Sequence, residues 1–457
     1  MTGVDLEALA GSVLDAALAA GASDAEAYAQ DGDGIEVRVF EGEVEALTEA
    51  AERGVGVRAW IDGRAGYAYG TDLGDEGLRG IAAAAVEAAR VADSDEFAGP
   101  PEGSGTGFAD VQGLRDPTLA GWGTEAKVKL AQEVERAARA ADRVVAIEDT
   151  VYADQAQRVA IASSSGARGD YESTSCYAYA RAIAADDDDE DRQTGLGFEV
   201  ARGPGKLDAG AIGGEAADRA TSLLGAQKPA SRACPVVLDE TVAASFIGFI
   251  GGVLCADAVQ RGRSPFAGSL GDEIGSAALT VADDGLDPAG PASAPFDGEG
   301  TPSSRTPLID AGTLRTYLHD SYTARRAGEG QTSTGNASRS GYRSPPSVST
   351  SNLVIAEGER TLEELLAEAA DGVYITDVAG LHSGVNPVSG TFSVGASGRR
   401  IEGGALSTPV TEFTIASDLP KMLAAVVAAG RPARWVPFGG SVKAPALLIG
   451  EMAVGGT

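Results

Sequence analysis

The feature that most constrains the fold is a stretch without any charged residue, positions 242–256. A helix that spans a membrane needs about 20 apolar residues, and Glu240 and Asp257 leave too few between them. We therefore expect a helix buried inside a soluble domain, capped at its start by Asp239 or Thr241. Its small residues predict that another backbone or the helix of a partner approaches closely: Ala243, Ala244, Gly248, Gly251, Gly252 and Ala256.

The length of 457 residues exceeds what a single hydrophobic core normally serves, so two or three domains are expected. A helix, a strand meander and a second helix predict an N-terminal domain over residues 1–105. A charged helix, long strands and another helix predict a central domain over residues 106–230. The rest, residues 231–457, has short strands with helices between them. The predicted fold class is α+β, with N-terminal α/β meander domains followed by a β-rich C-terminal domain.

The charge is strongly acidic, with 67 acidic against 36 basic residues and a formal net charge of −31. Such a surface repels itself in dilute salt and is screened at high ionic strength. The composition therefore predicts a halophilic, haloarchaeal protein, and it argues against nucleic-acid binding because no basic patch is present. The first 20 residues predict an amphipathic helix and no signal peptide, so we expect a cytoplasmic protein.

The residues that usually carry catalysis are scarce. The two histidines, His319 and His382, do not form a zinc-binding His-Glu-x-x-His motif. The sequence has no G-x-S-x-G elbow, no P-loop and no complete dinucleotide-binding fingerprint. Three cysteines do not predict a disulfide framework, and Cys255, in an apolar run, is expected to be a core thiol.

A glycine-dense segment near residue 390 is the candidate for peptide binding. Flexible glycine loops beside an uncovered strand edge can accept an extended peptide as an additional strand. Simple hairpin turns remain an equal alternative for this segment. The candidate residues are Gly384, Asn386, Gly390, Ser393 and Gly395.

Several segments, from the N-terminal meander to the last strand, resemble one protein family. The segment NPVSGTFSVGASGRRIEGGALSTPVTEFTIASDL, residues 386–419, is the most specific of them. Residues 54–73, 344–358 and 441–456 also fit. The chain is similar to members of the TldD/PmbA family, and most similar to the PmbA (TldE) branch. The resemblance implies a cytoplasmic metallopeptidase system that cleaves unfolded or extended peptides.

The resemblance also implies where a metal site would lie. In the TldD branch, a His-Glu-x-x-x-His helix, a later carboxylate and a C-terminal cysteine hold zinc. The position of that cysteine falls near Gly439 or Gly440 of this chain. The PmbA branch lacks this motif and pairs with TldD as a heterodimer. A zinc site needs about three protein donors. The counterpart positions on the uncharged helix are Ile247, Gly248, Gly252 and Cys255, of which only Cys255 has a donor atom.

Three functions remain open from the sequence. The first is a non-catalytic TldE-like subunit, with no cofactor of its own, beside a zinc-bearing TldD-like partner. The second is an autonomous metallopeptidase that uses His319, His382 and acidic residues. The third is a non-hydrolytic, peptide-binding homo-oligomer.

Overall fold

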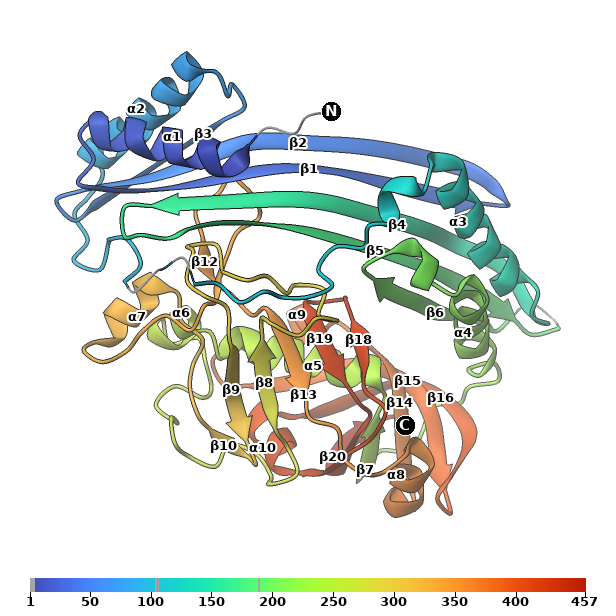
Figure 1. The fold of residues 1–457 in the computed structure, drawn as a ribbon. Coiled ribbons are helices and arrows are strands. Elements are labelled where there is room, and N and C mark those ends of the chain that lie inside the picture. The colour runs from blue at the N-terminus through green and yellow to red at the C-terminus, as the bar shows by residue number, and fades with distance from the viewer. Residues whose placement is uncertain (1–4, 103–104, 106, 188–189) are drawn as a thin grey trace.

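A computed structural model describes residues 5–102, 105, 107–187 and 190–457 (Figure 1). Its first half contains one long antiparallel sheet in the order β3-β2-β1-β4-β5-β6. The strands are β1 (Asp24–Phe40), β2 (Glu43–Ile61), β3 (Arg64–Gly70), β4 (Val144–Ser163), β5 (Arg168–Ala185) and β6 (Arg192–Ala201). The ranges predicted as the N-terminal and central domains thus contribute to one continuous sheet, joined where β1 pairs with β4.

This sheet is built from two copies of the same unit. Each unit runs helix, three strands, helix, with α1 (Leu6–Ala19) and α2 (Asp75–Val91) in the first and α3 (Thr124–Arg139) and α4 (Ala209–Thr221) in the second. The last strand and last helix of each unit meet at an equivalent glycine. A Cβ atom at Gly66 of β3 would collide with the backbone of α2, and one at Gly195 of β6 would collide with the backbone of α4.

The two faces of the sheet have different partners, because successive side chains of a strand point to opposite faces. On β1, Ala25, Ala27 and Ala29 pack under α1 and α2, whereas Ile35, Val37 and Val39 pack under α3 and α4. All six share what we call the outer face. The alternate residues lie on the inner face, which looks toward the C-terminal half (Figure 1).

The C-terminal half contains a closed barrel and a second sheet. The barrel strands are β7 (Arg232–Leu238), β14 (Gly372–Ala379), β15 (Thr391–Glu402), β16 (Ala405–Asp418) and β20 (Leu447–Gly455), with β17 (Val426–Ala429) attached to β20. The second sheet has the order β10-β9-β8-β13-β19-β18. Its strands are β8 (Val281–Asp284), β9 (Arg305–Asp310), β10 (Thr313–Leu314), β13 (Asn352–Ile355), β18 (Arg434–Val436) and β19 (Ser441–Ala444). The predicted α+β class with a β-rich C-terminal half is confirmed.

Shorter elements connect these sheets. A small ribbon pairs β11 (Ala337–Ser338) with β12 (Ser347–Val348). The remaining helices are α6 (Ala256–Gln260), α7 (Ser321–Ala327), α8 (Leu362–Ala369), α9 (Leu381–Gly384) and α10 (Leu419–Ala424), with 3-10 turns at Leu119–Gly121 and Pro204–Lys206.

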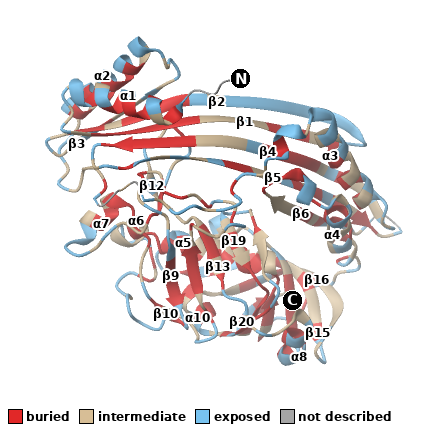
Figure 2. Ribbon diagram, in the orientation of Figure 1, coloured by how far each residue is buried: buried red, intermediate tan, exposed pale blue. Residues whose placement is uncertain are grey.

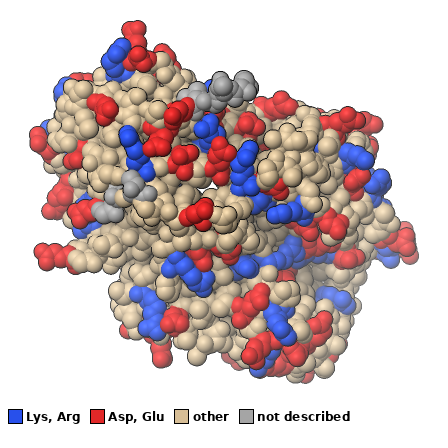
Figure 3. Space-filling view, in the orientation of Figure 1, with Lys and Arg blue, Asp and Glu red and all other residues tan. Residues whose placement is uncertain are grey.

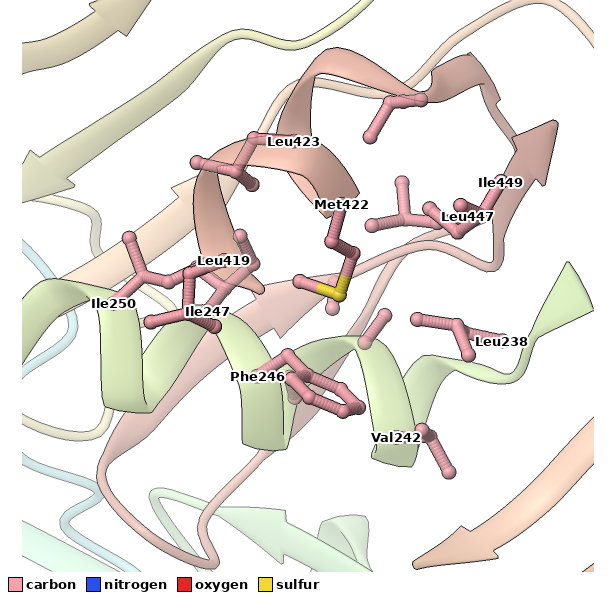
Figure 4. Close-up of a cluster of buried hydrophobic side chains, with 14 of the residues drawn as sticks. Leu238, Val242, Phe246, Ile247, Ile250, Leu419, Met422, Leu423, Leu447 and Ile449 are labelled. Atoms are coloured by element: carbon pink, nitrogen blue, oxygen red, sulfur yellow. The ribbon is translucent and has the colours of Figure 1, made fainter. Parts of the chain in front are cut away.

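The uncharged stretch forms helix α5 (Glu240–Val253), which lies between the barrel and the second sheet. Asp239 caps it by accepting a hydrogen bond from the backbone N–H of Val242 at 2.7 Å. Phe246, Ile247 and Ile250 belong to the largest core cluster (Figures 2 and 4). The predicted buried helix is confirmed, and none of the described helices is long and apolar enough to cross a membrane.

Several contacts fasten the N-terminal half to the C-terminal half, and two of them contain clustered ion pairs. At the first, on the inner face of the large sheet, an ion cluster is formed by three buried side chains and one partly buried side chain: Glu26, Glu299, Arg339 and the partly buried Arg58. Beside it, the ring of Tyr342 packs on the sheet over Gly54, where a Cβ atom would lie 2.7 Å from Cδ2 of the ring. At the second place, Arg219 of α4 pairs with Asp239 at 2.8 Å, Arg434 pairs with Glu215 at 2.6 Å, and Phe198 contacts Phe438.

Acidic side chains are spread over both halves of the visible face and are interspersed with Lys and Arg (Figure 3). This distribution is consistent with the acidic composition. A halophilic origin stays a prediction.

Candidate functional site

Helix α5 has one open stripe on an otherwise buried surface. Ser245, Gly248 and Phe249 are partly exposed and Gly252 is exposed, and their spacing places them along one side of the helix. A Cβ atom at Gly252 would meet nothing within 4 Å, and one at Gly248 would lie 3.1 Å from the carbonyl oxygen of Gly439. The predicted close approach is therefore made at Gly248 by the chain's own backbone.

The four counterpart positions of the metal motif divide between this stripe and the core. Gly248 and Gly252 lie on the open stripe, whereas Ile247 and Cys255 are buried. Burial raises the pKa of the Cys255 thiol to about 12, and the thiol donates to the carbonyl oxygen of Gly251 at 3.5 Å. Cys255 is thus a neutral core thiol, as predicted, and these four positions do not fit a zinc ion.

The two histidines are in different surroundings. His319 is buried, and desolvation lowers its pKa. His382 is exposed on α9. Within the described ranges, no group of three His, Cys, Asp or Glu side chains is arranged to hold a metal ion. The hypothesis of a site made from His319, His382 and carboxylates therefore has no geometric support.

The glycine-dense segment forms a closed turn. The side chain of Asn386 accepts hydrogen bonds from the backbone N–H groups of Val388 and Ser389 at 2.9 and 3.2 Å, and Gly390 takes a φ of +74°. The following strand β15, which carries Ser393 and Gly395, pairs with β16 on one side and β14 on the other.

The expected uncovered edge at this strand is therefore wrong, because both sides of β15 already have ladder partners at Gly395. A Cβ atom at Gly384 would also lie only 2.7 Å from the carbonyl oxygen of Ser393, so this glycine serves close packing. A role of Gly384, Asn386, Gly390, Ser393 and Gly395 in peptide binding stays a prediction.

Sequence reasoning missed a cavity of about 350 Å³ that lies between the inner face of the sheet and the loops of the C-terminal half. We call it the inner cavity. Strands β1, β4 and β5 supply one wall, with Gln30, Gln155, Gln157 and Tyr171. Residues 292–298, 335–341 and 349–351 contribute most of the opposite wall. Thr350 of this wall also reaches α5, where its Cγ2 would lie 2.9 Å from a Cβ atom at Gly251.

Aromatic rings form an apolar part of the cavity wall. Tyr171 meets Phe296 edge to face, with ring centroids 5.2 Å apart, and Tyr28 packs in the same cluster. Burial raises the pKa of Tyr28 to about 12, so its hydroxyl stays neutral near pH 7. These rings offer a flat, uncharged surface to a bound group.

Two charged groups that line the cavity, Asp297 and Arg339, are already satisfied within the chain. Asp297 accepts hydrogen bonds from the backbone N–H groups of Glu299, Thr301 and Ala337 at 2.9, 2.9 and 3.0 Å. Burial and the neighbouring Glu299 carboxylate raise the pKa of Asp297. Arg339 donates to the carbonyl oxygens of Gly298 and Ser344 and pairs with a carboxylate of the ion cluster. A third charged residue of the lining, Glu52, is partly exposed and pairs with Arg343 at 3.1 Å.

Three family models match the chain and together cover most of it. They are the PmbA/TldA metallopeptidase domain 1 at residues 25–89, the central domain at residues 117–224 and the C-terminal domain at residues 231–456. Among named relatives, Metalloprotease PmbA of Escherichia coli O157:H7 is 28% identical over 442 residues, which is 96% of this chain and 94% of that protein.

Solved structures share the fold. A Thermotoga maritima protein described as a putative modulator of a DNA gyrase aligns with a TM-score of 0.88 and 27% identity, over 98% of this chain and 99% of that one. TldE from Thermococcus kodakarensis aligns with a TM-score of 0.89, over 98% of this chain and 100% of that one. The identity to this TldE is 20%, so that likeness concerns the fold.

Proposed function

The chain belongs to the PmbA/TldD metallopeptidase family, and on that premise we propose that it is a TldE-like subunit without a metal site of its own. In this proposal a TldD-like partner holds the zinc ion and performs the hydrolysis of unfolded peptides. The open stripe of α5 carries the argument. Its two counterpart positions are glycines, Gly248 and Gly252, and neither can donate an electron pair from a side chain.

The same stripe suits a wall that a peptide or a partner element can approach. Gly252 leaves open space above the helix, and Phe249 beside it is only partly buried. A subunit of this kind helps to enclose the substrate while the reacting atoms lie on its neighbour. We propose the cytoplasm as its location, and a heterodimer as its working state.

The proposal is tested with the purified chain, alone and mixed with a TldD-like protein. Metal content is measured by mass spectrometry, and cleavage is measured on an unfolded peptide. We expect no stoichiometric zinc in the isolated chain, and faster cleavage by the mixture than by the TldD-like protein alone. Stoichiometric zinc in the isolated chain, or its own chelator-sensitive cleavage, would refute the subunit role.

A pair of matched variants tests the open stripe directly. Gly252→Trp fills the open space on α5 and should lower cleavage by the mixture without unfolding the chain. Gly121→Trp is the control, since a Cβ atom there also meets nothing within 4 Å and the residue lies in a 3-10 turn of the N-terminal half. Equal cleavage by both variants and the wild type would contradict a role of the stripe. If the mixture never exceeds the TldD-like protein, a non-hydrolytic peptide-binding oligomer replaces the proposal.

A further inference from the structure

A second cavity lies at one end of the C-terminal barrel, and its charged side chains are poorly paired within the chain. Its volume is about 170 Å³, and its lining comes from β7, β14, β15 and β20 and from the residues just before β7 and β14. The charged residues of the lining are Arg232, Asp371, Arg400 and Glu402. We call this space the barrel-end cavity. The mouths of β-barrels are common sites for small ligands.

Two arginines point into this cavity because of the strand register. Directly paired residues of neighbouring strands place their side chains on the same face of a sheet. Arg400 of β15 pairs with Val373 of β14, and Arg232 of β7 pairs with Val454 of β20. Both valines belong to the core inside the barrel, so both arginines are on the inward side, at the end of the barrel. Within the described residues, Arg232 has no carboxylate within 4.0 Å.

Two carboxylates complete the lining, and they too lack a close cation. Asp371 and Glu402 lie next to the paired residues Gly372 and Ile401, which places them opposite each other. Like charges in this arrangement repel each other. No cationic side chain of the described ranges lies within 4.0 Å of Asp371. Glu402 pairs with Arg400 at 3.9 Å, and these two side chains are 57% and 34% exposed.

The separated charges match a ligand that carries both signs. A simple anion would leave the two carboxylates uncompensated, and a simple cation would leave the two arginines uncompensated. The α-carboxylate of a free amino acid suits the guanidinium groups, which bind carboxylates through paired N–H donors. Its α-ammonium group suits Asp371 and Glu402. The uncharged part of the wall is apolar, with Pro229, Val373 and Val454, and suits a small aliphatic side chain.

We propose that the barrel-end cavity binds a free α-amino acid with a small aliphatic side chain. Arg232 and Arg400 hold its carboxylate, and Asp371 and Glu402 hold its ammonium group. The cavity is separate from the open stripe of α5, because Phe392, near the other end of β15, packs against that helix. Arg400 lies roughly 25 Å farther along the strand. The inference therefore does not depend on the proposed function.

Binding is measured by isothermal titration calorimetry at pH 7 in a fixed concentration of KCl, with the purified chain and with its mixture with a TldD-like protein. The probes are L-valine and two analogues that each lack one charge, isovalerate without the ammonium group and isobutylamine without the carboxylate. The variants are Arg400→Gln and Asp371→Asn. The control is Arg38→Gln, because Arg38 is also partly exposed and forms a similarly long pair with Glu36 of the same strand, at 3.8 Å. Thermal melting verifies that all variants are folded.

We expect millimolar affinity for L-valine, since the charges are partly exposed, and about tenfold weaker binding of either analogue. Arg400→Gln and Asp371→Asn should each weaken L-valine binding about tenfold, the effect of one lost charge-assisted hydrogen bond. Arg38→Gln should bind as the wild type does. Asp371→Asn should also bind isovalerate more tightly than the wild type does, because a carboxylate beside the bound anion is gone. A loss of structure would not produce this gain.

Four results would overturn the proposal. Equal affinity for L-valine and isovalerate would identify a simple anion site, and equal affinity for L-valine and isobutylamine a simple cation site. Unchanged L-valine binding by both Arg400→Gln and Asp371→Asn would place the ligand elsewhere. Absence of binding in both preparations at about 10 mM L-valine would leave the cavity without this ligand. Because no measurement depends on cleavage or zinc, failure here is distinct from failure of the subunit role.

Discussion

The contact between Gly54 and Tyr342 offers a sharp test of how the loop at residues 335–351 is fastened to the large sheet. A Cβ atom at Gly54 would lie 2.7 Å from Cδ2 of the Tyr342 ring and closer still to Cε2. The ring is 1% exposed, so it has no free space into which it can move. Gly54→Ala should therefore expel the ring from the sheet.

The magnitude follows from the burial of the ring. An aromatic side chain buries about 150–250 Å², and truncation of a large core aromatic costs about 3–5 kcal/mol. We expect Gly54→Ala and Tyr342→Ala each to lower the free energy of unfolding by about 3–5 kcal/mol. The double variant should be no less stable than Tyr342→Ala alone, because the methyl group then occupies the space that the ring has left. Alanine is also better suited to a strand interior than glycine.

The assay is urea unfolding of the wild type, both single variants and the double variant, followed by circular dichroism. Limited proteolysis is run in parallel and should cut within residues 335–351 in every variant that frees the loop. The double-mutant cycle should give a coupling energy of about 3 kcal/mol. If the two single effects simply add, or if Gly54→Ala is neutral, the two residues do not exclude each other and the reasoning is refuted.

Three further predictions concern charges and helix packing. Glu26→Gln should cost about 3–5 kcal/mol because it removes the carboxylate that pairs with the buried Arg339 and leaves Arg58 with Glu299 alone. Glu87→Gln, in an exposed pair, should cost less than about 1 kcal/mol, and equal urea midpoints for the two variants would contradict this. Burial raises the pKa of Asp239 from its ordinary 3.8 to about 6, so the folded state binds this proton more tightly than the unfolded chain does. The free energy of unfolding of the wild type should therefore fall by up to about 3 kcal/mol, relative to that of Asp239→Asn, as the pH rises from about 4 to about 6. A difference between the two proteins that does not change with pH would contradict this prediction. Gly213→Ala should destabilise the protein by about 1–3 kcal/mol, since its Cβ atom would lie 2.6 Å from atoms of α3. At the next residue, Gly214, a Cβ atom meets nothing within 4 Å, so Gly214→Ala should stabilise the protein by up to about 1 kcal/mol. Thermal melting of the two variants should show shifts of opposite sign.

Local patterns predicted what depends on a single element. Helix α5 could be predicted from its uncharged stretch, its Asp239 cap and the charged residues beyond it. Burial and capping of a helix are encoded within about 20 positions of the sequence. Cys255 could likewise be assigned to the core from its apolar neighbours. The β-rich C-terminal half was recognisable from its alternating short strands.

Features that depend on distant strands were not predictable in this way. The two halves of the large sheet are related by single positions such as Gly66 and Gly195, which are too sparse to reveal a repeat. An open edge was expected at Gly395 because the sequence does not say which strands flank β15. The inner cavity combines strand β4 with loops more than 130 residues away, and Gln155 alone is indistinguishable from a solvent-facing residue.

The continuity of the large sheet limits how the N-terminal half can move above the inner cavity. Strands β1 and β4 are paired from Glu26 to Val39, so any hinge between the two structural copies would have to break this hydrogen-bonded ladder. Separation of this sheet from the C-terminal half would have to break the ion cluster, the Arg219–Asp239 contact and the hydrogen bonds that Arg325 donates to carbonyl oxygens of residues 97–100.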